Sequence, residues 1–235
     1  ACGLQCPGPI LKMKKTMDSL VSGDRVEITS TDPGFPRDAA AWCNSTGNQL
    51  ISKEAAGGKS VVVIEKGEPK SCNIVTSCEG KGKTFIMFSD DLDKALATFV
   101  LANGAAATGQ KVTIFFTFWG LNVIKKLHKP NVEKDIFGKM FGMMLPSSSR
   151  KLKLSKMSMG GIGGKMMRYI MNRKGIDSLE SLRQQALENG VEFIACQMSM
   201  DVMGVKQEEL LDKVTIGGVA TYMERADNAN INLFI

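Results

Sequence analysis

The chain has 235 residues, 43% of them hydrophobic and 23% charged, with a formal net charge of +6 at pH 7. This composition is typical of a globular protein with one large domain or two smaller ones. No apolar run approaches the roughly 20 residues of a membrane-spanning helix, and six irregularly spaced cysteines do not make a disulfide scaffold. With one histidine and no CxxC pair, we predict no metal site and a reducing, cytoplasmic location.

The first distinctive feature is a cysteine placed before two prolines. Cys6 precedes Pro7, Gly8 and Pro9, and residues 9–20 then place their apolar side chains near one face, which predicts an amphipathic helix. Because proline suits a first helical turn, Cys6 should lie at or just before the helix N-terminus, where unpaired N–H groups favour a thiolate. Position alone supports a reactive thiol and a small apolar residue about equally.

The residues that follow complete a small α/β unit. Strands are predicted at residues 25–29, 50–54 and 61–65, with a second helix from Pro36. The order helix, strand, helix, strand, strand predicts a two-layer α/β sandwich with both helices on one face of the sheet.

This region also carries a family resemblance. The run from Gly3 to Leu11 is similar to the GLxCPxPIL signature of the TusA/SirA sulfur-carrier family, and the similarity extends over residues 1–67. The resemblance implies that Cys6, and not Cys2, carries a persulfide. It also implies one more strand before Ala1, so that the first strand is expected to be truncated and the natural start to lie upstream.

Residues 68–82 are predicted to be a linker because they are rich in helix and strand breakers. Cys72 and Cys78 lie in it, either as relay thiols or, the interpretation we favour, as incidental exposed cysteines. Beyond the linker, residues 83–235 alternate strands and helices. Strands are predicted at 84–88, 111–118, 191–196, 214–216 and 231–235, and helices at 89–107, 178–189, 206–212 and 220–227, with a short helix ending at His128. This alternation predicts a mainly parallel, doubly wound sheet.

Cys196 is the last residue of its predicted strand. Ligands and chemistry gather at the carboxyl ends of parallel strands, where backbone N–H groups stabilise a thiolate. A buried cysteine that completes an apolar strand explains the position equally well.

The second region resembles the DsrE/DsrF family, in the subgroup with Thr117 to Leu121 after one strand and Ala195 to Met200 after another. The resemblance implies a flavodoxin-like fold, a homo-oligomer formed through this domain, and persulfide relay at Cys196. By analogy Phe118 and Trp119 lie at the same sheet edge, where core packing under a loop is the interpretation we favour.

The segment of residues 136–176 has an unusual composition. It has no acidic residue, eight of the fifteen methionines, and nine basic residues: Lys139, Arg150, Lys151, Lys153, Lys156, Lys165, Arg168, Arg173 and Lys174. Methionine adapts to irregular apolar surfaces, and basic residues attract anionic ones. Three interpretations stay open for an insertion over about residues 129–176: a peripheral contact with a membrane or partner, an oligomer interface, or a partly disordered insertion.

A TusA-like domain fused to a DsrE-like domain resembles the C-terminal part of FAD-dependent coenzyme A-disulfide or polysulfide reductases that also contain a rhodanese. The resemblance implies that FAD and NAD(P)H, if used, bind upstream, and that a rhodanese or reductase domain is the sulfur donor or acceptor. No cofactor is predicted in this chain, since no GxGxxG follows a strand.

Two functions are therefore considered. The first is a sulfurtransferase-type relay in which Cys6 carries sulfane sulfur and passes it to Cys196 or a partner. The alternative is a regulatory or binding module that contacts RNA, an anionic membrane or a protein. The absence of a stacking series of aromatic residues near the basic segment disfavours nucleic acid.

Overall fold

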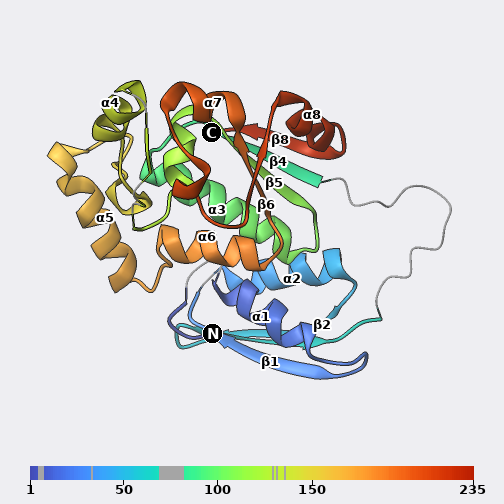
Figure 1. Ribbon diagram of the computed structural model, residues 1–235. Coiled ribbons are helices and arrows are strands. Elements are labelled where there is room, and N and C mark those ends of the chain that lie inside the picture. The colour runs from blue at the N-terminus through green and yellow to red at the C-terminus, as the bar shows by residue number, and fades with distance from the viewer. Residues whose placement is uncertain (5–7, 33, 69–81, 129, 131, 135) are drawn as a thin grey trace.

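The computed structural model describes residues 1–4, 8–32, 34–68, 82–128, 130, 132–134 and 136–235. The thiols of Cys6, Cys72 and Cys78 lie outside the described residues. Two domains are visible, a small one formed by the N-terminal residues and a large one formed by the rest (Figure 1).

The small domain has the predicted order of elements: α1 (Gly8–Asp18), β1 (Arg25–Ser30), α2 (Phe35–Thr46), β2 (Gln49–Ala56) and β3 (Lys59–Glu65). Its strands form an antiparallel sheet in the order β1-β3-β2. Alternate residues of β3 are buried, among them Val62 and Ile64, and they pack with Met13 of α1 and Phe35 of α2. Both helices thus cover one face of the sheet, as the sequence predicts.

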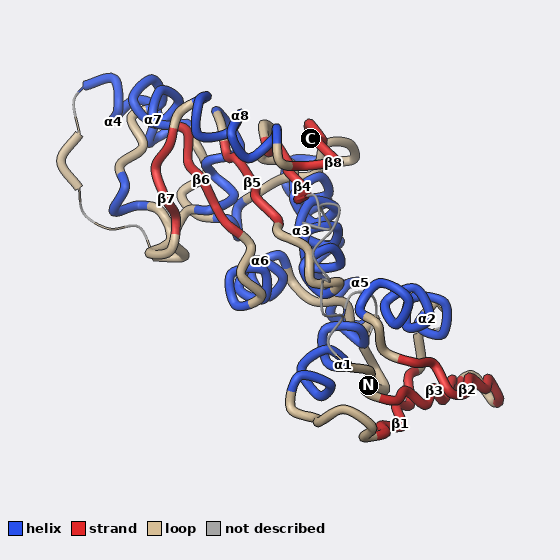
Figure 2. Tube along the Cα trace, turned by 90° about the vertical axis from the view of Figure 1, so that its right-hand side faces the viewer, coloured by secondary structure: helices blue, strands red, loops and turns tan. Residues whose placement is uncertain are grey.

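The large domain is built on the strands β4 (Gly82–Met87), β5 (Val112–Phe116), β6 (Glu192–Cys196), β7 (Val214–Gly217) and β8 (Ala229–Phe234). All neighbouring pairs are parallel and the order is β7-β6-β5-β4-β8 (Figure 2). The α/β class and the doubly wound sheet are confirmed. The first strand begins at Gly82, which the sequence assigned to the linker.

Three helices cover the faces of this sheet: α3 (Leu92–Ala107), α6 (Leu179–Glu188) and α8 (Val219–Asp227). Phe116 of β5 and Phe193 of β6 pack with Phe99 of α3 in the main core, to which Leu182 of α6 also belongs. On the opposite face, Phe115 packs with Tyr222 of α8. The central strands β5 and β6 therefore bury both of their faces, which explains their continuous apolar sequences.

Several predicted helices differ in the structure. The segment after β5 is a 3-10 helix, η1 (Phe118–Ile124), so the predicted helix end at His128 is wrong, and His128 lies in an exposed bend. The buried Arg183 of α6 ties η1 down by donating to the backbone oxygens of Val123 and Lys125. The helix predicted at 206–212 shrinks to the 3-10 turn η4 (Gln207–Glu209), and α7 (Gln197–Met203) begins directly after Cys196.

The basic segment is largely helical rather than irregular. It contains α4 (Ile136–Met144), the 3-10 turns η2 (Ser149–Lys151) and η3 (Met159–Gly161), and α5 (Ile162–Arg173). Of the three interpretations of this insertion, partial disorder is not supported for its described residues. No helix among the described residues is long and apolar enough to cross a membrane.

Candidate functional site

The first candidate thiol, Cys6, stands in the sequence between Leu4 and Gly8, both of which are described. Helix α1 begins at Gly8 with Pro9 in its first turn, as predicted. A Cβ placed on Gly8 would lie 3.1 Å from Cβ of Leu4, a contact tight enough to explain glycine at this position. Leu4 and Gly8 are thus close together at the start of α1.

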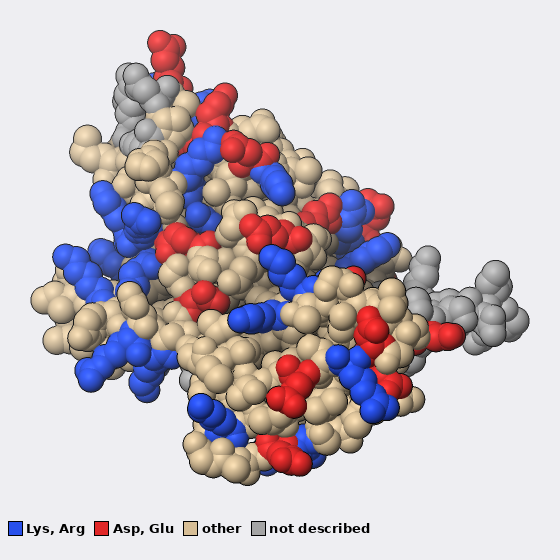
Figure 3. All heavy atoms as spheres, turned by 90° about the horizontal axis from the view of Figure 1, so that it is seen from below, with Lys and Arg blue, Asp and Glu red and all other residues tan. Residues whose placement is uncertain are grey.

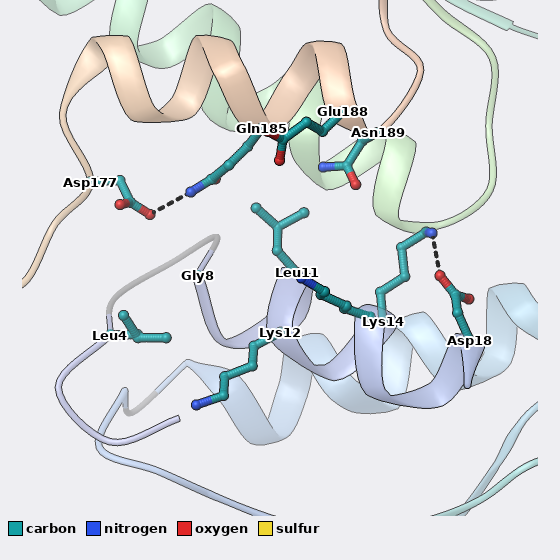
Figure 4. A pocket seen from close by; sticks show the side chains of 11 residues that line it. Leu4, Gly8, Leu11, Lys12, Lys14, Asp18, Asp177, Gln185, Glu188 and Asn189 are labelled. Atoms are coloured by element: carbon teal, nitrogen blue, oxygen red, sulfur yellow. Dashed lines mark hydrogen bonds and ion pairs between the residues drawn. The ribbon is translucent and has the colours of Figure 1, made fainter. Parts of the chain in front are cut away.

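Leu4 and Gly8 line a cleft of about 550 Å³ between the two domains (Figure 4). The α1 wall carries Lys12, Lys14 and Lys15 together with Asp18, which pairs with Lys14 at 2.7 Å, so this wall stays net cationic. The other wall carries Asp177, Glu188 and Asn189 at the two ends of α6. The cleft therefore pairs a cationic wall with an anionic one, an arrangement suited to polar or zwitterionic groups.

Direct contacts hold the small domain on the α3–α6 side of the large one. The indole N–H of Trp42 in α2 donates to the backbone oxygen of Ala107, and Ala107 belongs to the buried core of the small domain. A second close contact joins the domains at Gly175, where an added Cβ would lie 2.0 Å from the backbone oxygen of Gly3. Only glycine permits this close approach, since Gly175 also has a φ of 67°.

The second candidate thiol, Cys196, lies where the sequence places it, at the carboxyl end of β6. Its residue is 6% exposed and pairs in parallel register with Gly217 of β7. The side chain belongs to the cluster of Phe115, Ile194 and Tyr222, on the face covered by α8. Cys196 is thus a buried thiol between the start of α7 and the start of α8.

The two candidate sites are on opposite sides of the large sheet. Successive strand residues point to opposite faces, so Phe193 and Ala195 face α3 and α6 whereas Ile194 and Cys196 face α8. The small domain docks on the α3–α6 side. The structure does not bring Cys196 to the cleft beside α1, and the sheet itself separates them.

Aromatic residues border the carboxyl edge of the sheet, as predicted by analogy. Phe118 is partly buried and contacts Phe88 with tilted rings, and Phe88 in turn contacts Phe234 at the end of β8. Trp119 is 43% exposed, so the interpretation that it packs in the core is wrong. No sequence pattern indicated one contact at this edge: the hydroxyls of Thr117, directly after β5, and Ser199 of α7 share a buried hydrogen bond of 2.8 Å.

The remaining described cysteines differ in exposure. Cys2 is exposed, and its sulfur lies 3.9 Å from the backbone oxygen of Thr29. Cys43 is buried in the small core, and burial raises the pKa of its thiol to about 11. Among the described residues, no three His, Cys, Asp or Glu side chains gather in a way that would hold a metal ion.

Comparisons with known proteins match both domains. Residues 80–234 match the DsrE/DsrF/DrsH-like family and residues 1–66 match sulfurtransferase TusA. The uncharacterized protein YrkE of Bacillus subtilis is 44% identical over 155 residues, which are 66% of this chain and 97% of YrkE.

Two further relatives come from Allochromatium vinosum. The sulfur carrier protein DsrE2 is 38% identical over 161 residues, 67% of this chain and 99% of that protein. The sulfur carrier protein TusA is 42% identical over 66 residues, 28% of this chain and 87% of that protein. The matched regions coincide with the two domains of the structure.

Proposed function

Since the chain belongs to the DsrE/DsrF/DrsH-like family and carries a TusA domain at its N-terminal side, we propose that it relays sulfane sulfur as a cysteine persulfide. In this proposal Cys6 accepts the sulfur and Cys196 receives it. The single observation that carries the proposal is the presence, in one chain, of two domains that are each similar to a named sulfur carrier.

The transfer step is a thiol exchange with no net oxidation. The Cys196 thiolate attacks the outer sulfur of the Cys6 persulfide, a new S–S bond forms on Cys196, and the old S–S bond breaks. Cys6 leaves as a thiolate and Cys196 becomes the persulfide, so that electrons and protons balance without a cofactor. The step requires the two sulfurs to come into contact.

The observed arrangement places a condition on that contact. With the small domain docked on the α3–α6 side and Cys196 buried on the α8 side, the domain must leave its docking site before its motif can reach Cys196. A fully extended chain from Glu68 to Gly82 spans roughly 45 Å, and this length limits how far such a movement can reach. Transfer between two copies, or to another protein, avoids the need for this movement within one chain.

Intact-mass measurement tests the proposal. The wild-type chain, exposed to a sulfane-sulfur donor and freed of excess donor, should gain additions of about 32 Da, the mass of one sulfur. Cys6→Ser should lose this uptake, and Cys2→Ser, the exposed neighbour in the same segment, should keep it. Equal uptake by Cys6→Ser and the wild type would contradict the role of Cys6.

The partners belong to the same proposal. A relay needs a donor and an acceptor protein, for which a rhodanese or a disulfide reductase domain has suitable chemistry. The larger flavoenzyme stays a prediction.

The homo-oligomer also stays a prediction. It is supported by β8, a strand at the edge of the sheet on which Ile231, Leu233 and Phe234 are exposed. Sedimentation velocity of the wild type beside Leu233→Lys tests it, since a lysine on this edge should leave a monomer.

A further inference from the structure

The helix α5 is attached to the large domain by one narrow face. A Cβ on Gly163 would lie 2.0 Å from the backbone oxygen of Met157, and one on Gly164 would lie 3.3 Å from that of Leu152. Met171 is buried on the same side, and Arg168 bonds Glu180 and the backbone oxygen of Ser149. These contacts fix the rotation of the helix about its axis, and therefore which residues point outward.

The outward-pointing residues are mainly apolar. Four exposed side chains on one side of the helix form what we call the outer face of α5: Ile162, Met166, Tyr169 and Ile170. They are 64%, 44%, 66% and 40% exposed. A surface helix ordinarily buries its apolar stripe and presents polar residues to water, so α5 has the reverse arrangement.

Two further apolar side chains lie at the start of this helix. Met157 and Met159 are 68% and 65% exposed, and both have positive φ, 57° and 43°. A left-handed backbone is unfavourable for a residue other than glycine. The chain thus adopts two costly conformations shortly before α5, each with an exposed methionine.

The surroundings of the outer face are cationic. Lys165, Arg173 and Lys174 on or just after α5 are exposed, as are Lys151, Lys153 and Lys156 before it, and residues 136–176 contain no acidic residue. In Figure 3 basic side chains gather along the left-hand side of the molecule, the side on which α5 lies in Figure 1. Lysine and arginine stems extend past an apolar surface while their charges stay in water.

We propose that the outer face of α5 binds an anionic membrane surface, with the helix lying in the plane of the lipid headgroups. An apolar stripe flanked by basic residues suits the headgroup boundary of such a surface, where tyrosine is also favoured. RNA would meet the same charges, but Tyr169 is the one aromatic side chain of this face, so the face offers bases no series of stacking partners. A helix of 12 residues is too short to span the bilayer, so this binding is peripheral.

Vesicle co-sedimentation of the full chain tests this proposal. We expect the wild type to bind phosphatidylcholine vesicles that contain phosphatidylglycerol, to bind pure phosphatidylcholine at least tenfold more weakly, and to dissociate as salt rises. The double variant Met166→Asp/Tyr169→Asp should bind the anionic vesicles at least tenfold more weakly than the wild type.

The matched control is Met223→Asp/Val21→Asp, which adds the same charge at positions with similar exposure, 49% and 68%, on other elements. It should retain wild-type binding. Equal binding by the two double variants, no binding of the wild type to anionic vesicles, or binding only to RNA would overturn the proposal. The proposal would also be overturned if the wild type formed an oligomer and Met166→Asp/Tyr169→Asp were a monomer, because this face would then join two copies of the chain. Sulfur uptake by Cys6 should be unchanged in every variant.

Discussion

The two domains differ in the surroundings of their candidate sites. In the small domain the motif around Cys6 stands between Leu4 and Gly8, which line an open cleft, and the sheet has helices on one face only. In the large domain Cys196 is buried at the end of a strand, in a sheet with helices on both faces. In the proposed relay this difference gives the two sites different roles, because a carrier must meet several partners whereas a buried receiving thiol would keep a persulfide away from solvent.

The largest expected effect is on the free energy of unfolding, which truncation of a core side chain should lower in either domain. Phe35 is fully buried in the small core and Phe99 is fully buried in the large one. Phe35→Ala should lower the free energy of unfolding of the small domain by about 3–5 kcal/mol, enough to unfold a domain of this size. Limited proteolysis should then degrade the small domain and leave the large one intact.

Phe99→Ala serves as the control for that experiment. It should lower the stability of the large domain by a similar free energy, with both domains still folded at room temperature because the large core is more extensive. Loss of both domains together in Phe35→Ala would show instead that the docked domains unfold as one unit.

The next comparison concerns thiols within the small domain. Because burial raises the pKa of Cys43 to about 11, little of its thiol is ionised at pH 8, and the residue is also inaccessible. Alkylation of native protein, followed by peptide mass mapping, should label Cys43 at least about 100-fold more slowly than exposed Cys2. Similar rates would indicate that the small core opens readily.

A moderate effect is expected at the docking contact. Trp42→Phe keeps an aromatic ring in the small core but removes the N–H that bonds the backbone oxygen of Ala107. Loss of this hydrogen bond should weaken docking by about 1–3 kcal/mol. Amide hydrogen exchange at the C-terminal end of α3 should accelerate, and transfer from Cys6 to Cys196 should become faster. Slower transfer would mean that the docked state is the productive one.

The smallest expected effect is on the thermal midpoint, through the side chain of Asp90, which lies shortly after the end of β4. Burial raises the pKa of Asp90, and the hydrogen bond from Asn122 only partly opposes this shift. A carboxyl whose pKa is raised on folding costs stability when it is ionised, at pH values above its folded pKa. Asp90→Asn should therefore raise the thermal midpoint at pH 7 by about 2 °C.

This gain should shrink as the pH falls through the folded pKa of Asp90, since the wild-type carboxyl then becomes neutral as well. Calorimetry of both proteins at several pH values measures the difference. A gain that stayed constant down to pH 3 would show that burial of the charge is not its cause.

The sequence predicted most elements because their patterns are local. The apolar runs of residues 61–65 and 111–118 predict β3 (Lys59–Glu65) and β5 (Val112–Phe116) to within two residues at each end. The face to which Cys196 points was not predictable, since both faces of β6 are apolar and alternation cannot tell them apart. The docking of the domains depends on contacts between distant residues, such as Trp42 with Ala107, that no local pattern records.

In the basic segment the sequence could not show which face of a helix would be exposed. Its many glycines indicate a loop, yet Gly163 and Gly164 allow α5 to approach its neighbours closely. The spacing of Ile162, Met166 and Tyr169 carried a helical signal. It gave no means of deciding whether that face was buried or exposed, which only the packing of the helix determines.

The measurement that tests the central claim most directly is the order in which the two cysteines are loaded. After a brief pulse of sulfane-sulfur donor, peptide mass mapping of the alkylated wild type should find the persulfide first on Cys6 and later on Cys196. In Cys6→Ser, Cys196 should remain unloaded. Loading of Cys196 at the same rate in Cys6→Ser as in the wild type would contradict the relay.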